Sequence, residues 1–317
     1  MAVRRRKQRR GRSYAWRYRG RIVACVFVEV LIICALVIMV GWNKGVKEWF
    51  EQFEQPVLKE VDISGINSPN AILMQARGGK ILGEINGEAQ IYPASMTKIM
   101  TVILGIENFD NLDEKITLTD EMFAGLYEQD ATQAGFQPGE EVRVIDLLYG
   151  AMLPSGAECC IALADTISGS EADFAELMNK KARKLGMENT HFVDCCGLTE
   201  STDHYTTVRD IAIMSRELIT KYPKILEYSS IWMENITHVT RQGSKEFCLT
   251  NTNKLLRSYD GCIGLKTGST SLAKYCVSAV ASRNNITLIS VVMAAPDYKV
   301  RFKDAAAMLN YGFSKCS

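Results

Sequence analysis

Three short segments of the chain place hydroxyl and ammonium groups at spacings that suit nucleophilic catalysis. In the first, SMTK, Ser95 and Lys98 are three residues apart at the start of an apolar segment. Residues at this spacing share one face of a helix, so the lysine can reach the serine hydroxyl. A hydroxyl becomes a nucleophile when a base removes its proton, and a neutral lysine can act as that base. The same spacing also arises by chance, with the serine as a helix N-cap and the lysine in solvent.

A lysine that acts as a base must have a lowered pKa. A free lysine has a pKa near ~10.4, so the site has to lower it by about three units, or about 4 kcal/mol. Burial in an apolar helix lowers the pKa of a lysine, and a second cation nearby does the same. We therefore expect Lys98 to be buried and Lys266 to supply the second positive charge. The positive end of the helix dipole would also face Ser95.

Two further motifs follow along the chain. SGA stands at residues 155–157 and KTGST at residues 266–270. Together with SMTK, in this order, they resemble the active site of the penicillin-recognising serine enzymes. The segments YPASMTKIMT, HYTT and LNYGF make the chain most similar to the serine D-alanyl-D-alanine carboxypeptidases, which are the low-molecular-mass penicillin-binding proteins of bacterial cell walls. The resemblance extends over residues 60–316.

The resemblance assigns roles to individual side chains. Ser95 would be the nucleophile, Lys98 its base, and Ser155 the hydroxyl that passes a proton between the nucleophile, the lysine and the leaving amine. The backbone amides of Ser95 and Ser269 would form an oxyanion hole, which acts on charge that develops in the transition state. Gly268 would let the substrate backbone approach closely. The substrate-binding set that we expect is Lys266, Thr267, Gly268, Ser269, Thr270 and Arg301.

Two basic residues near these motifs have less specific roles. Arg301 would help Lys266 and Thr267 to hold the terminal carboxylate of the substrate, but it could equally be a surface residue that opens the last helix. His204, in the segment DHYTT, is expected to fix a loop rather than to take part in chemistry.

The resemblance implies removal of the terminal D-alanine from peptidoglycan pentapeptides through an acyl-enzyme at Ser95. β-Lactams would be covalent inhibitors, and no cofactor, metal ion or nucleic acid would be needed. Three alternatives stay open: a D,D-endopeptidase, a β-lactamase, and a degenerate protein that binds penicillin or the wall without catalysis. The three histidines (His191, His204 and His238) form no metal-binding motif, which argues against a zinc-dependent carboxypeptidase.

The second motif departs from the family pattern. Relatives usually have S-x-N there, whereas this chain has Ala157 in place of the asparagine, followed by Glu158 on another side of the helix. The missing amide would normally bind the substrate or the catalytic lysine. Losing one good hydrogen bond costs roughly 1–1.5 kcal/mol, or about a tenfold loss in rate. Either the enzyme is slow or altered in specificity, or a neighbouring group fills the space and Ala157 is already optimal.

Apolar and turn residues predict a sheet built from both ends of the catalytic domain. Residues 71–87 predict a hairpin around two glycines, and residues 274–295 predict a second hairpin across two asparagines. The resemblance implies an α/β fold of the β-lactamase/transpeptidase type, with a mainly antiparallel sheet, helices on both faces and a helical subdomain. The sequence predicts helices over residues 95–106, 142–156, 158–167, 172–185, 206–222 and 301–313.

The N-terminal part of the chain predicts a single-pass membrane anchor. Residues 1–21 carry ten Lys and Arg and no acid, and residues 22–40 are apolar except for Glu29. Such a stretch can cross a hydrocarbon core about 30 Å thick, and its basic side stays in the cytoplasm. A cleaved signal peptide and a nucleic-acid-binding arm are the competing interpretations. We expect a cytoplasmic tail (1–21), a transmembrane helix (22–42), an amphipathic linker (43–56) and an extracellular catalytic domain (57–317).

Composition and cysteine content add two expectations. The chain of 317 residues is 47% hydrophobic and 23% charged, which permits a well-filled core and excludes global disorder. Among its ten cysteines are two adjacent pairs, Cys159–Cys160 and Cys195–Cys196. We expect a disulfide between one member of each pair, which would close a loop of ~35 residues and contribute ~3 to 4 kcal/mol. Buried free thiols are the alternative.

Overall fold

The structure is a computed structural model, and it describes residues 58–240 and 243–315. The predicted tail, span and linker (1–21, 22–42 and 43–56) lie outside the described residues. Within the two described ranges, no helix is both long enough and apolar enough to cross a membrane.

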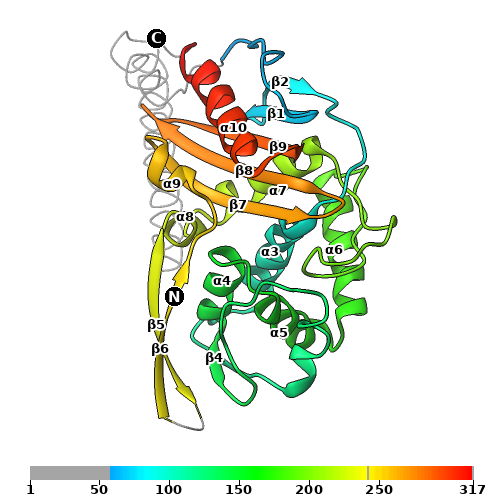
Figure 1. Ribbon diagram of the computed structural model, residues 1–317, viewed down its shortest axis with the longest axis vertical. Coiled ribbons are helices and arrows are strands. Elements are labelled where there is room, and N and C mark those ends of the chain that lie inside the picture. The colour runs from blue at the N-terminus through cyan, green and yellow to red at the C-terminus, as the bar shows by residue number, and fades with distance from the viewer. Residues whose placement is uncertain (1–57, 241–242, 316–317) are drawn as a thin grey trace, which may run out of the picture. The chain divides into compact units, whose positions relative to one another are not determined.

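Strands from the two ends of the described chain pair in one sheet, as the sequence predicts (Figure 1). The order of its five strands is β2-β1-β9-β8-β7, and neighbouring strands run antiparallel. The KTGST motif lies on β7, at the edge of the sheet. The strands are β1 (Asn70–Gln75), β2 (Ile81–Ile85), β7 (Cys262–Thr270), β8 (Lys274–Arg283) and β9 (Ile286–Ala295).

Both predicted hairpins are confirmed, and their turns have the expected backbone geometry. Gly78 and Gly79, between β1 and β2, have φ angles of 77° and 68°. Asn284 and Asn285, between β8 and β9, have φ angles of 49° and 61°. Two adjacent residues with positive φ form a turn whose twist matches that of the flanking strands, and asparagine tolerates this conformation better than most residues.

Helices cover both faces of the sheet. Helix α10 (Tyr298–Phe313) packs over β8 and β9 on one face, and α7 (Val208–Lys221) packs on the other (Figure 1). Successive side chains of a strand point to opposite faces, so a strand in this position must be apolar on both. In β1, Leu73 belongs to the core beneath α10 and Ile72 belongs to the core on the opposite side.

A helical subdomain continues the core on the α7 side of the sheet. Helix α3 lies at its centre and packs against α4, α5, α6 and α7. Its run of apolar residues is buried almost throughout, as expected for a helix without a polar face. The subdomain consists of α3 (Lys98–Asn108), α4 (Val144–Met152), α5 (Ala157–Ser168) and α6 (Glu171–Leu185), with a small sheet of β3 (Lys115–Thr117) and β4 (Glu141–Arg143).

Several elements have no counterpart among the predicted ones. The most extended is a hairpin of β5 (Met233–Thr240) and β6 (Gly243–Thr250), which projects beside the helical subdomain in Figure 1. Strand β6 is mostly exposed, so its sequence lacks the buried face that gives a strand its alternating pattern. The others are too short for a periodic signal: β3, η2 (Asp120–Phe123), α8 (Ile225–Ser229) and α9 (Leu255–Ser258). The helices predicted over residues 95–106 and 142–156 begin instead as η1 (Ala94–Thr97) and as β4.

Candidate active site

The candidate nucleophile lies on the short 3-10 turn η1, which runs directly into α3. Side chains three residues apart eclipse each other in a 3-10 turn. The Nζ atom of Lys98 therefore reaches the Oγ atom of Ser95 and donates a hydrogen bond of 3.1 Å to it. The structure brings the predicted pair into contact, with a tighter first turn than the α-helix that the sequence predicts.

Two glycines leave space for the backbone around Ser95. Ala94, immediately before it, has a φ of 47°, a left-handed conformation that costs of order 1–3 kcal/mol in a residue with a side chain. A Cβ atom on Gly197 would lie 1.8 Å from the Ala94 carbonyl oxygen, and one on Gly268 would lie 3.1 Å from the Ser95 backbone nitrogen. Gly268 therefore makes room for the backbone of the nucleophile, whereas the sequence predicts that it makes room for substrate.

Two hydrogen bonds hold the ammonium group of Lys98 in place. The side chain is 1% exposed, and Nζ donates a second hydrogen bond, of 2.9 Å, to the carbonyl oxygen of Cys196. Cys196 stands on the loop that precedes Gly197, which itself packs on η1. The same loop therefore positions both the nucleophile and the lysine.

The charges on the two lysines differ from the sequence-based expectation. Burial is the largest single influence on the pKa of Lys98 and lowers it, but negative charge on Cys196 and its neighbours outweighs burial and raises the pKa above the ordinary lysine value. Burial, and then the positive charge of Lys98, lower the pKa of Lys266 well below its ordinary value. The expected lowering at Lys98 was wrong for the free protein, because the sequence does not reveal the loop that packs on this lysine.

Ser155 follows α4 in a strained conformation. The φ angle of Ser155 is 73°, and the residue is 7% exposed. The Oγ atom has no hydrogen-bond partner in the described part of the chain. Leaving a buried hydroxyl without a partner costs about 1–3 kcal/mol, so its persistence needs an explanation. A hydroxyl held free in this way is available to a substrate.

The second motif is linked to the lysine through Cys196. The Sγ atom of Cys196 lies 3.5 Å from the carbonyl oxygen of Ala157. Ala157 is fully buried, which favours the interpretation that the space beside it is filled. Glu158 points away from the site, and its Oε1 atom accepts hydrogen bonds from the backbone nitrogens of Ala134 (2.6 Å) and Gly135 (3.0 Å).

The KTGST side chains on β7 have different environments. Lys266 is 1% exposed, and its Nζ atom donates a hydrogen bond of 3.0 Å to the carbonyl oxygen of Thr267. The Thr267 hydroxyl lies 2.6 Å from that of Thr252. Ser269 is exposed, whereas the Thr270 hydroxyl accepts a hydrogen bond from the backbone of the following turn. Strand β7 therefore offers both buried and accessible polar groups.

Arg301 donates a hydrogen bond to the backbone of the KTGST motif. Its Nη1 atom donates hydrogen bonds to the carbonyl oxygens of Gly268 (3.1 Å) and Cys276 (3.2 Å). Burial lowers the pKa of the guanidinium, and its Nε atom is buried without a partner in the described residues. Arg301 is therefore not the surface residue of the alternative interpretation.

His204 fixes a loop against the nucleophile's turn. The backbone nitrogen of Val193 donates to its Nδ1 atom at 3.0 Å, so the proton of the neutral ring is on Nε2. That Nε2 atom lies 2.9 Å from the hydroxyl of Thr97. Burial lowers the pKa of His204 and keeps the ring neutral. This arrangement agrees with the structural role that the sequence predicts.

The two cysteine pairs lie together beside Lys98, but as free thiols. The Sγ atoms of Cys195 and Cys196 are 3.5 Å apart. Hydrogen bonds from the thiols of Cys160 and Cys195 lower the pKa of Cys196 well below its ordinary value. The expected disulfide is thus absent, although the expected proximity of the two pairs is present. No signal in the sequence distinguishes these outcomes.

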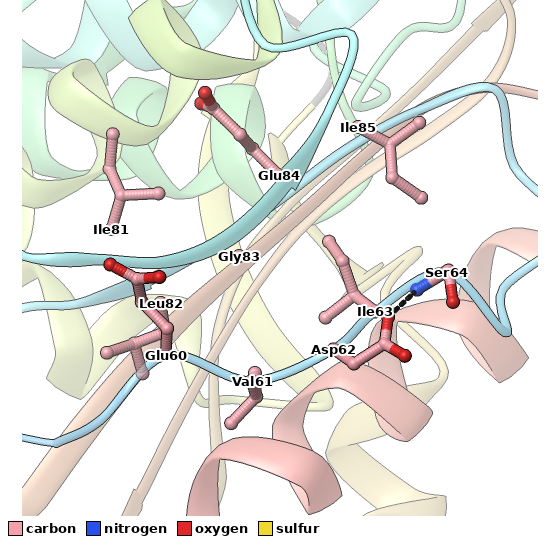
Figure 2. Close-up of a pocket in the computed structure, with 10 residues that line it drawn as sticks. All are labelled: Glu60, Val61, Asp62, Ile63, Ser64, Ile81, Leu82, Gly83, Glu84 and Ile85. Atoms are coloured by element: carbon pink, nitrogen blue, oxygen red, sulfur yellow. Dashed lines mark hydrogen bonds between the residues drawn. The ribbon is translucent and has the colours of Figure 1, made fainter.

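A separate groove of about 640 Å³ runs along β2 (Figure 2). Segment 60–64 forms its other wall and pairs with β2 through a hydrogen bond of 2.8 Å from the Val61 nitrogen to the Leu82 carbonyl. None of the catalytic or substrate-binding residues predicted above lines this groove. The predicted catalytic residues lie instead at the junction of η1, β7 and the Cys196 loop.

A known family matches the part of the chain that contains this junction. The model of the D-alanyl-D-alanine carboxypeptidase family, peptidase family S11, matches residues 57–297, a range that contains all three motifs. The chain belongs to this family. The serine-type hydrolase chemistry and the penicillin binding that characterise the family agree with the pairing of Ser95 and Lys98.

Relatives and solved structures agree with this membership. The chain is 40% identical to the D-alanyl-D-alanine carboxypeptidase DacF of Bacillus subtilis over 250 residues, which are 78% of this chain and 62% of DacF. It is 38% identical to the D-alanyl-D-alanine carboxypeptidase of Streptomyces sp. K15, over 69% of this chain and 78% of that relative. The chain thus spans less than two thirds of DacF but more of the shorter relative.

The fold is that of a penicillin-binding enzyme. The crystal structure of the Streptomyces K15 DD-transpeptidase matches with a TM-score of 0.76 and 32% identity, covering 81% of this chain and 100% of that one. The D-alanyl-D-alanine carboxypeptidase DacD of Francisella tularensis matches with a TM-score of 0.73 and 25% identity, covering 82% of this chain and 74% of that one. The fold class implied by the sequence is confirmed.

Proposed function

We propose that the chain is a serine D-alanyl-D-alanine carboxypeptidase that releases the terminal D-alanine from peptidoglycan pentapeptides and is acylated by β-lactams. The observation that carries the proposal is the hydrogen bond of 3.1 Å between the Ser95 hydroxyl and the buried Lys98 ammonium. Strand β7 supports it, because Gly268 lies against the backbone of the nucleophile. A peptide along this edge strand would meet the hydroxyl directly.

In the first half of the reaction, Ser95 Oγ forms a bond to the carbonyl carbon of the penultimate D-alanine. The carbonyl oxygen becomes negative, and the backbone amides of Ser95 and Ser269 are the donors that we assign to it. The bond to the terminal D-alanine nitrogen then breaks, and that nitrogen takes up a proton. In the second half, water attacks the ester and restores Ser95.

The proton of Ser95 must pass to a neutral amine. Lys98 is protonated in the free protein, because negative charge near Cys196 raises its pKa, whereas Lys266 has a lowered pKa. A substrate carboxylate beside Lys266 would raise the pKa of Lys266, and the added positive charge would lower that of Lys98. Substrate binding would thereby favour the neutral form of Lys98 that can accept the proton.

The remaining roles follow the positions of the polar groups. Ser155 Oγ is buried and unpartnered, which suits a hydroxyl that relays a proton to the leaving nitrogen. Lys266 and Thr267 are the groups that we assign to the terminal carboxylate, together with exposed Ser269 and the turn residue Thr270. Arg301 contributes positive charge through its contact with the Gly268 carbonyl.

The decisive experiment measures D-alanine release by the full chain in detergent micelles. The substrate is a stem pentapeptide that ends in D-Ala-D-Ala, and labelled penicillin reports acylation. Ser95→Ala and Lys98→Ala should each lose at least about 10³-fold in release, because nucleophile and base act as a unit. Ser64→Ala and Lys180→Ala change the same residue types at exposed positions and should behave like wild type.

The same experiment separates the alternatives. Penicillin labelling that persists in Ser95→Ala would overturn the mechanism. Labelling without D-alanine release would indicate a protein that binds penicillin but does not hydrolyse the peptide, and fast release of hydrolysed penicillin would indicate a β-lactamase. Cleavage of cross-linked dimers in preference to pentapeptides would indicate a D,D-endopeptidase.

A transpeptidase is the second candidate, because the matched Streptomyces K15 structure is named a DD-transpeptidase. In that reaction an amine replaces water as the acceptor of the acyl group. Adding an amino acid amine such as glycine to the assay would then give a new peptide product at the expense of hydrolysis. A product spectrum that stays purely hydrolytic would reject this candidate.

We further propose that residues 22–42 anchor the chain in the cell membrane, with residues 1–21 in the cytoplasm and the catalytic domain outside. The ten basic residues before the apolar segment support this orientation. A protease added to intact protoplasts should remove the catalytic domain and leave an N-terminal tag intact. Digestion of the tag in intact protoplasts, or release of the chain from washed membranes by salt, would contradict the proposal.

A further inference from the structure

Two thiols and a carboxylate lie together at the loop that holds Lys98. The carboxylate of Glu171, at the start of α6, and the thiols of Cys195 and Cys196 lie with their donor atoms within 4.8 Å of one another. None of the three side chains is assigned a contact with the substrate in the proposed reaction. Two thiols and a carboxylate at this spacing are the donors that thiophilic divalent cations prefer.

The distances between these donors suit one metal ion. Glu171 Oε1 is 3.0 Å from Cys195 Sγ, which in turn is 3.5 Å from Cys196 Sγ. In tetrahedral zinc sites the metal lies at about 2.3 Å from sulfur and about 2.1 Å from oxygen, which separates the donors by about 3.6–3.8 Å. Glu171 Oε1 and Cys195 Sγ would have to move apart by about 0.6 Å, and the two sulfur atoms by about 0.3 Å, to accept an ion.

The backbone of this loop is already organised. The carboxylate of Asp194 accepts hydrogen bonds from the backbone nitrogens of Cys196 (2.7 Å), Leu198 (3.2 Å) and Thr199 (2.8 Å), and also from that of Gly197. The backbone nitrogen of Cys195 donates to Glu171 Oε1 at 3.1 Å. Donors whose backbone is fixed before binding lose little conformational freedom when the ion arrives.

An ion would have both a route and room for a further ligand. A cavity of about 480 Å³ borders the donor set and is lined by Glu171, Cys196 and Asp194, among others. Cys195 and Cys196 are otherwise buried, at 0% and 1% exposed, so the cavity is the path by which a small cation would reach them. The same cavity has room for a further ligand beside Glu171 and Cys196.

We propose that Glu171, Cys195 and Cys196 form a binding site for a thiophilic divalent cation of the zinc class. The ion bonds to both sulfurs as thiolates, any proton that a thiol still carries leaves through the cavity, and the carboxylate supplies the third ligand. Because the Cys196 carbonyl accepts a hydrogen bond from Lys98, the ion would be held by a residue that also positions the catalytic lysine. Metal binding at this site does not depend on the proposed peptidase activity.

Cadmium binding tests the proposal directly, since Cd²⁺ occupies zinc sites and its bonds to thiolates absorb in the ultraviolet. The reduced full chain in detergent micelles is titrated with Cd²⁺ alone, and the bound metal is counted by mass spectrometry after desalting. Wild type should bind one Cd²⁺ with thiolate absorption. Cys195→Ser should lose that absorption, and Glu171→Gln should weaken binding by at least about tenfold.

Cys248→Ser is the matched control, because Cys248 is an exposed thiol on β6, away from the donor set. This variant should bind Cd²⁺ like wild type. Thermal melts establish that each variant is folded, and Glu171→Gln keeps the test decisive if Cys195→Ser does not fold. Wild type that binds no Cd²⁺, or folded Glu171→Gln that binds with wild-type affinity, would overturn the proposal. Loss of binding in Cys248→Ser would do the same.

Discussion

Adding one methyl group at Gly268 should slow the chemistry at Ser95 without touching a catalytic side chain. The new Cβ atom would lie 3.1 Å from the Ser95 backbone nitrogen, and 3.2 Å from both the Ala94 Cβ and the Met96 nitrogen. Favourable non-bonded contacts of carbon begin near about 3.5 Å, so η1 would have to move by about 0.4 Å. Ala94 already has a left-handed backbone, which leaves η1 little freedom to adjust without further strain.

The size of the effect follows from this displacement. Overpacking of this kind costs about 1–3 kcal/mol in stability. A misplacement of about 1 Å costs about 10²-fold in rate, so a shift of less than half that should cost about tenfold in Gly268→Ala. Gly197→Ala is more severe, because its Cβ would lie 1.8 Å from the Ala94 carbonyl oxygen and its φ is 75°. That variant should lose most of its folded population.

The assay is the second-order rate of acylation by fluorescent penicillin, measured together with the melting temperature. Gly65→Ala is the control, because its Cβ would meet only the Tyr311 hydroxyl, at an ordinary contact distance of 3.6 Å. The rate of acylation should be highest in Gly65→Ala, lower in Gly268→Ala and lowest in Gly197→Ala. If Gly268→Ala acylates as fast as wild type at an unchanged melting temperature, the close packing of β7 on η1 does not control the reaction.

Three further variants test the site and its surroundings. Ala157→Asn should lower kcat/KM for D-alanine release by about tenfold, because Ala157 is fully buried and an amide has no free space there; an increase would instead support a missing hydrogen bond. Burial raises the pKa of Glu107, but hydrogen bonds from Lys181, Lys221 and Tyr222 together outweigh burial and lower the pKa from 4.5 to about 2. The ionised Glu107 carboxylate therefore stabilises the fold above pH 4.5, and this contribution is lost as the pH falls towards 2. In urea unfolding at pH 7, Glu107→Gln should be about 1–2 kcal/mol less stable than wild type. Near pH 2 the two proteins should have the same stability. His204→Gln should lower the melting temperature but leave the pH dependence of acylation unchanged; a shifted pH profile would assign the ring a part in proton transfer.

Local features of this protein were predictable from residue order alone. Short apolar runs and the turn pairs Gly78–Gly79 and Asn284–Asn285 predicted two hairpins that the structure contains. The three-residue spacing of Ser95 and Lys98 predicted a contact, since one helical turn joins them whatever surrounds it. Such features depend on interactions between residues that are close in the sequence, and a pattern of residue types records those directly.

The charges at the site were decided by tertiary contacts. Lys98 and Cys196 are 98 residues apart, and their hydrogen bond brings thiols and Asp194 close to the lysine. The pKa of Lys98 is raised for this reason, although its burial in an apolar helix correctly suggested a lowering influence. Burial is readable from periodicity, but the sign of the charges that surround a buried group depends on which distant loop covers it.

Tertiary contacts also decide the role of Arg301 and the donor set of Glu171, Cys195 and Cys196. The cysteine pairs were visible in the sequence, yet whether they meet as a disulfide, as free thiols or as metal ligands depends on Sγ distances that only the packed loop sets. Arg301 was visible at the start of the last helix, but its hydrogen bond to Gly268 requires α10 to lie across the sheet behind β7. Spacing in the chain determines which groups are available to the site, and the packing of distant segments determines the distances, charges and partners with which they act.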